Sequence, residues 1–285
     1  MKRLLLLMSA GWAFGQSVSA PVPEDVRKNF SLAGFYQKYL DARGLPIVSS
    51  GKVRDAALRE AAWILDQVLE GRDDIRRALA ANKVRLVVMA VDEYTTDVPE
   101  HSRLTPRDYW DRRARGLGPS PDAPAVSCGE ENLLGFPGDH YAAENILIHE
   151  FAHAIHQMGL NTVDPTFDGR LRQAFGRAKG LGLWAGAYAG TNPEEYWAEG
   201  VQSWFGNNRE NDASHNAVNT RSELEAYDPG LTALCREVFG AREWTYQKPA
   251  DRPEAGREHL KDYKPEAAPT FHWRPGTEKA TEGKP

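Results

Sequence analysis

Residues 145–156 read NILIHEFAHAIH, and this stretch decides which fold the chain can form. Apolar residues at helical spacing predict a packed helix over residues 142–159. Residues four apart share one helix face, so His149 and His153 can direct two imidazoles at one ion. Glu150 lies beside them, where its carboxylate can take a proton from a water whose pKa zinc has lowered toward ~7. The motif therefore predicts a zinc site with Glu150 as general base.

A zinc site that keeps one position open needs a third protein ligand. Residues 188–199 read YAGTNPEEYWAE and begin a second predicted helix, residues 192–205, with Asn192 as its N-cap. Glu195 and Glu199 lie one turn apart on one face, which costs energy unless a cation lies opposite. We predict Glu195 as the third ligand.

The sequence alone leaves alternatives open for the third ligand. Glu195 falls three residues after the N-cap, so its carboxylate could instead complete a capping box. His156 lies seven residues after His149, and Glu194 directly precedes Glu195. We rank both below Glu195.

The two motifs together resemble the catalytic domain of anthrax toxin lethal factor and the related Pro-Pro endopeptidases, over residues 145–205. The resemblance implies that the zinc ligands are His149, His153 and Glu195, with Glu150 as the base. It also implies that Tyr188 stabilises the oxyanion and that Glu199 supports a ligand histidine. An ordinary half-buried tyrosine is the alternative for Tyr188. An aspzincin pattern at Gly190-Thr191 fails, because Pro193 occupies its Asp position.

The resemblance implies a fold of the gluzincin type. We expect an α+β, mostly helical zincin-type metallopeptidase with a small sheet over the active-site helix, followed by a helical half. The likeness covers a minority of the chain and does not identify the substrate.

Patterns outside the motifs predict further elements. Helices are expected at residues 24–42, 56–69, 73–81 and 230–239, and strands at 83–91 and 131–136. Residues 92–125 are expected to be an irregular connection with one short helix at 106–114, and residues 180–190 a Gly-rich connection.

The N-terminal residues have the order of a secretory signal: a basic pair, an apolar run and small residues. The run is too short to span a bilayer, and a buried N-terminal helix is the alternative. We predict a signal peptide over residues 1–20, cut either before Gln16 or before Pro21. A single zincin-like catalytic domain then covers 21–246, and an extended tail covers 247–285.

Composition narrows the choice of partners. The formal net charge is −5 without a basic cluster, which excludes nucleic acid as the expected partner. The two cysteines, Cys128 and Cys235, predict one disulfide in an exported chain, with two free buried thiols as the alternative.

The two motifs predict a zinc-dependent endopeptidase that acts on protein or peptide substrates. The N-terminal pattern predicts that it is secreted, extracellular or periplasmic, without a stable membrane anchor. Two alternatives stay open. One is a non-catalytic zinc-binding protein, which an intact Glu150 argues against because a structural site needs no base. The other is a zinc hydrolase of a non-peptide bond.

Overall fold

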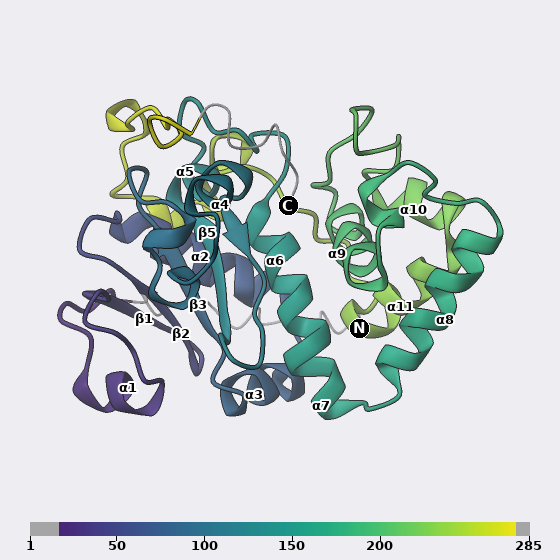
Figure 1. Cartoon of the computed structure of the whole chain (residues 1–285), viewed down its shortest axis with the longest axis horizontal. Helices are drawn as coiled ribbons and strands as arrows, with labels where there is room; N and C mark the ends of the chain where they lie inside the picture. Colours follow the sequence, from purple (N-terminus) through teal and green to yellow (C-terminus); the bar gives the residue numbers. More distant parts are fainter. Residues whose placement is uncertain (1–16, 278–285) are drawn as a thin grey trace, which may run out of the picture.

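A computed structural model describes residues 17–277 and shows a sheet half joined to a helical half. The helix α6 (Ile146–Ala154), which carries the first motif, runs between the two halves (Figure 1). The expected α+β class is confirmed, with one five-stranded mixed sheet beside a larger number of helices.

The sheet has the strand order β1-β2-β3-β5-β4. The pairs β1–β2 and β4–β5 are antiparallel, whereas β2–β3 and β3–β5 are parallel. The strand bounds are β1 (Lys38–Ala42), β2 (Leu45–Ser49), β3 (Arg85–Met89), β4 (Gly116–Leu117) and β5 (Ala125–Gly129).

Both faces of the sheet are buried, which explains why β3 is apolar from Leu86 to Met89. Val88 faces the main core, together with residues of α2 (Asp55–Val68) and α6. Val87 faces a smaller core that the N-terminal segment with α1 (Glu24–Asn29) covers. A strand buried on both sides reads as a continuous apolar run, so the expectation for residues 83–91 is confirmed.

The helix expected over residues 24–42 is wrong in its second half. Only α1 is helical, and residues 38–49 form the β1–β2 hairpin. Arg43 and Gly44 both have positive φ, 56° and 92°, as a two-residue turn of the primed type requires. Pairing with β2 thus prevails over the helical pattern of this segment.

The strand expected over residues 131–136 is also wrong. The chain forms the helix α5 (Glu130–Leu134) there, and the strand β5 that precedes it was not predicted; only its first residue, Ala125, falls in the connection expected to be irregular. Glu131 at the start of α5 pairs with the buried Arg115, at 2.6 Å between carboxylate Oε1 and guanidinium Nε. This long-range ion pair cannot be read from local sequence.

Other predicted helices are confirmed within a few residues. They are α2, α3 (Asp73–Ala81), α4 (Arg107–Arg113), α6, α9 (Pro193–Trp204) and α11 (Pro229–Phe239). Two helices of the helical half, α8 (Phe167–Gly180) and α10 (Arg221–Tyr227), were not among the expected elements. Both lie beside α9 and α11 in Figure 1.

Residues 247–277, in the segment set apart as an extended tail, follow the surface of the sheet half in short 3-10 turns (Figure 1). Arg252 donates two hydrogen bonds to the buried Glu60 of α2, at 3.0 and 2.5 Å. The His259 ring lies 2.7 Å from the same carboxylate. The division of the chain into domains stays a prediction.

The predicted disulfide is wrong in this structure. Cys128 and Cys235 are free, fully buried thiols, one on β5 in the sheet half and the other on α11 in the helical half. Burial raises the pKa of both thiols, which keeps them protonated. The pairing was inferred from cysteine number and export, and neither of these carries information on distance.

The predicted signal segment lies mostly outside the described residues, which begin at residue 17. None of the helices within residues 17–277 has both the length and the apolar character that a membrane span needs.

Candidate metal centre

The structure brings together the three residues predicted to bind zinc. Glu195 Oε2 lies 3.0 Å from His149 Nε2 and 3.4 Å from His153 Nε2. One ligand atom from each residue lies within 4.8 Å of the other two, and no other such group of three occurs among the described residues. Three side chains from two helices that are far apart in the sequence thus converge on one point.

The local sequence explains how α6 presents both imidazoles. Asn145 caps the helix, because its side-chain oxygen accepts a hydrogen bond from the Ile148 amide at 3.0 Å. Buried apolar residues fill the remaining faces, so His149 and His153 share the face directed at α9.

The first alternative ligand, His156, is not part of the cluster. The helix continues from Ile155 to Leu160 with π-helical turns, and His156 lies about two turns along the axis from His149, too far to reach the same ion. Its Nε2 lies 3.0 Å from Asp168 Oδ1 instead. The second alternative, Glu194, pairs with Arg172 at 2.9 Å.

The helix α9 positions Glu195 in its first turn. The Asn192 side chain accepts a hydrogen bond from the Glu195 amide at 2.8 Å, so the predicted N-cap is confirmed. The Glu195 carboxylate faces the two histidines and is not engaged in a capping box. Trp197 fixes α9 against α6, because its indole donates to the Ala152 carbonyl at 2.9 Å.

The second nitrogen of His149 has a partner that sequence reasoning missed. His149 Nδ1 lies 2.8 Å from Gln202 Oε1, whereas the predicted partner Glu199 is at 3.5 Å. Gln202 follows Glu195 by seven residues and Glu199 by three, so all three side chains share one face of α9. That spacing is the signal that could have identified Gln202.

Charge in the cluster is balanced internally. Burial works against a charge on His149, but the hydrogen bond to Glu195 and the nearby carboxylates outweigh it and raise the pKa of His149 well above its usual range. Burial likewise opposes ionisation of Glu195, yet the hydrogen bonds from His149 and His153 hold its pKa far below the usual range. A buried carboxylate that stays ionised is a suitable partner for a cation.

The donor set fits a zinc ion. Two imidazole nitrogens and one carboxylate oxygen are ligands that zinc commonly takes, and three protein ligands leave a fourth position open. A divalent cation would satisfy the Glu195 carboxylate while both imidazoles remain neutral. His153 Nδ1 is buried without a hydrogen-bond partner among the described residues, which leaves its ring free of a competing structural role.

A cavity of about 290 Å³ opens beside the cluster. Its wall includes Glu150 from α6 and Tyr188 from the short 3-10 turn η4 (Tyr188–Gly190), which directly precedes α9. Burial raises the pKa of both groups. The Arg113 guanidinium forms a hydrogen bond with the Tyr188 phenol. The open face of the metal site is thus bordered by the two side chains given catalytic roles from sequence.

The sheet reaches this cavity through the edge strand β4, because two glycines let it approach α6 closely. A Cβ atom on Gly116 would lie 2.4 Å from Ile146 Cγ2 and 3.1 Å from Glu150 Cγ. A Cβ atom on Gly118 would lie 2.9 Å from His153 Cβ. Any larger residue at these positions would push the strand away from the motif helix.

Comparison with solved structures shows a likeness to a known peptidase, whereas the other comparisons find no match. No protein-family model matches the chain, and no curated protein matches it. Among solved structures, the chain is similar to the Pro-Pro endopeptidase PPEP-2 from Paenibacillus alvei, with 20% sequence identity and a TM-score of 0.40. The match covers 70% of this chain and 98% of that one. It falls in the family that the two motifs resemble, but at this TM-score the functional conclusion rests on the geometry of the site alone.

Removing the Glu195 carboxylate tests the ligand set. We expect Glu195→Ala to lose most of its zinc, because two imidazoles alone give an incomplete site. Metal content is measured after dialysis of zinc-loaded protein. Glu194→Ala, which removes a neighbouring carboxylate that pairs with Arg172, is the control and should keep its zinc. Full retention of zinc by Glu195→Ala would show that the third ligand lies elsewhere.

Proposed function

We propose that this chain is a secreted zinc-dependent endopeptidase. The observation that carries the proposal is the convergence of His149, His153 and Glu195 beside a cavity whose wall also holds Glu150. This is a three-ligand site with an open side and an adjacent carboxylate, the arrangement of catalytic rather than structural zinc sites. A structural site closes its fourth position with another protein ligand, which argues against a non-catalytic zinc protein.

In this mechanism a bound zinc ion supplies a Lewis acid and lowers the pKa of water. Glu150 accepts the proton of the attacking water and passes it to the leaving amine. Its place next to His149 in the chain directs its carboxylate to the cavity where substrate lies.

Tyr188 stabilises the negative charge that develops on the substrate carbonyl oxygen. Its phenol has a raised pKa, mainly through burial, and therefore stays protonated as a hydrogen-bond donor at neutral pH. The Arg113 guanidinium forms a hydrogen bond with this hydroxyl group and can fix its direction. A donor held in place before the reaction begins stabilises the transition state most effectively.

A zinc hydrolase of a non-peptide bond would use the same residues, so the substrate decides between the two activities. Digestion of a peptide library by the purified protein separates them.

Glu150→Gln preserves the shape of the side chain but removes the base. We expect the variant to keep its zinc and to lose about 10²–10⁴-fold in kcat on a peptide substrate, as expected for loss of proton transfer. Metal content and turnover are measured on the same preparation. Near wild-type turnover by the zinc-loaded variant would overturn the assignment of Glu150.

Tyr188→Phe removes only the phenolic donor. Loss of one oxyanion donor should lower kcat by about 10²–10³-fold with little change in KM. Steady-state kinetics on one peptide decide the question. A variant in which KM alone changes would move Tyr188 from transition-state stabilisation to substrate binding.

Export rests on the sequence pattern of the first residues, and the described structure favours one of the two cleavage positions. Ser19 exchanges two backbone hydrogen bonds with Tyr39, at 2.8 and 2.9 Å. A cut before Gln16 keeps this bridge, whereas a cut before Pro21 removes it. We therefore expect N-terminal sequencing of exported protein to begin at Gln16. An intact Met1 outside the cytoplasm would contradict a cleaved signal.

A further inference from the structure

We propose that Gln202 selects the metal-binding tautomer of His149, and that Glu144 and Arg209 hold Gln202 in the orientation this requires. The inference rests on the proposed zinc site and assigns positioning roles to three residues that neither motif contains. Each link depends on which atoms can donate a hydrogen bond and which can only accept one.

The first link fixes the Gln202 amide. Gln202 Nε2 lies 3.0 Å from Glu144 Oε2, and its Oε1 lies 2.8 Å from His149 Nδ1. A carboxylate can only accept, so the NH₂ end of the amide must face Glu144. The carbonyl end then faces His149. Gln202 is fully buried, which leaves water little access to compete for these contacts.

The second link fixes the imidazole. An amide carbonyl oxygen can only accept a hydrogen bond, so His149 Nδ1 must carry a proton. Without a metal, Nε2 donates to Glu195 Oε2; in the neutral ring the same atom would present its lone pair to a bound cation. A ligand histidine is commonly held by its other ring nitrogen in this way.

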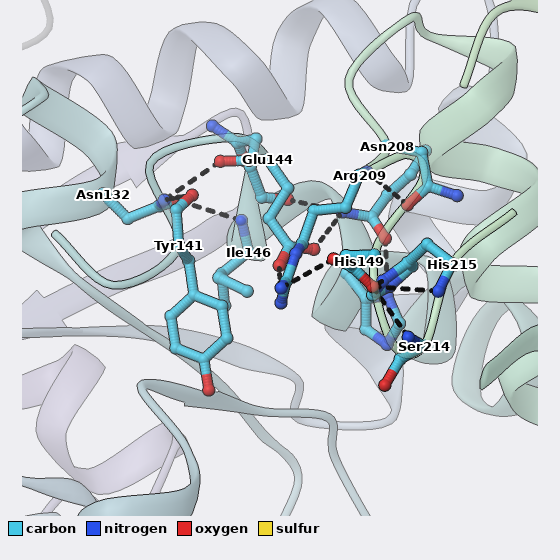
Figure 2. Close-up of polar contacts among 12 residues, drawn as sticks. Asn132, Tyr141, Glu144, Ile146, His149, Asn208, Arg209, Ser214 and His215 are labelled. Carbon is cyan, nitrogen blue, oxygen red and sulfur yellow. Dashed lines mark hydrogen bonds and ion pairs between the residues drawn. The ribbon is translucent and has the colours of Figure 1, made fainter. Parts of the chain in front are cut away.

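The third link keeps Glu144 an acceptor. Burial raises the pKa of Glu144, whereas the hydrogen bond from Gln202 and the Arg209 guanidinium, whose Nη1 lies 3.6 Å from Glu144 Oε1, act against this and favour the ionised carboxylate. Asp212 anchors Arg209 at 2.7 Å, and the Arg209 side chain is about one-third exposed. Figure 2 shows Glu144 and Arg209 beside His149.

Arg209 belongs to a loop, residues 207–216, that contacts the site at two further points. Asn208 donates to Glu199 Oε2 at 3.0 Å, and His215 Nε2 lies 3.6 Å from the same atom. The Ser214 carbonyl accepts a hydrogen bond from the Tyr188 amide at 2.6 Å. Asn208, Ser214 and His215 surround His149 in Figure 2. The loop that holds Arg209 therefore also supports the partners of His149 and Tyr188.

The test measures zinc affinity by competition with a chelator, without any substrate. Gln202→Leu keeps much of the side-chain volume and removes both polar contacts, so its Kd for zinc should rise about 10–100-fold. Glu144→Gln should also weaken binding, because an amide at that position can donate and lets the Gln202 amide turn over. Glu210→Gln is the control: this loop residue is exposed and bonds only Asn211 among the described residues, so its Kd should not change.

A double variant distinguishes a positioning role of Arg209 from general damage to its loop. Arg209→Ala should weaken zinc binding in the wild-type background but add nothing in the Gln202→Leu background, because both act through one relay. Unchanged zinc affinity in Gln202→Leu, or fully additive losses in the double variant, overturns the proposal. Either outcome leaves the proposed peptidase intact if wild-type protein binds one zinc and cleaves peptides. Should Gln202→Leu fail to fold, Glu144→Gln and Arg209→Ala decide.

Discussion

The packing of α6 against α9 is the contact on which the rest of the site depends. It brings the carboxylate of Glu195 out of water and next to two imidazoles, and an ionised group in such a place is costly unless a cation faces it. Trp197 binds the backbone of α6 through its indole and fixes how the two helices meet. The carboxylate also lies in the first turn of α9, where the helix dipole favours negative charge. Geometry and electrostatics thus define the same small volume for a cation.

The remaining parts of the site are attached to these two helices. The turn with Tyr188 leads into α9, and the 207–216 loop follows its other end, so both are attached to the helix that supplies Glu195. From the other half, the edge strand β4 reaches α6 through Gly116 and Gly118. Substrate would therefore lie between a rigid sheet edge and groups supported by the helical half. The two buried, separate thiols show that this arrangement is held by packing without a covalent cross-link within the described residues.

The sequence predicts the parts of the site that depend on helical spacing. The imidazoles of His149 and His153 share a face because four residues make about one turn. Asn192 is a typical N-cap residue and therefore predicts where α9 begins. The spacing from Glu195 places Gln202 on the same face of α9, but its role depends on contacts with His149 and Glu144 of another segment, and these the sequence does not show. The partner of His156 was equally hidden, since its ring pairs with Asp168 of α8 and that contact cannot be read from its own segment. Strand β5 was missed and the α5 segment was predicted as a strand, because both elements depend on long-range pairing, including the Arg115–Glu131 ion pair.

The central claim is that one zinc ion is bound by His149, His153 and Glu195. X-ray absorption at the zinc edge of the metal-loaded protein tests it most directly, since it reports the ligand atoms without substrate or turnover. Zinc bound by these three residues should show a first shell of nitrogen and oxygen at about 2.0–2.2 Å, with two imidazole rings. The two-imidazole signal should fall to one ring in His153→Ala. A sulfur shell near ~2.3 Å, or an unchanged pair of imidazoles in His153→Ala, would contradict it.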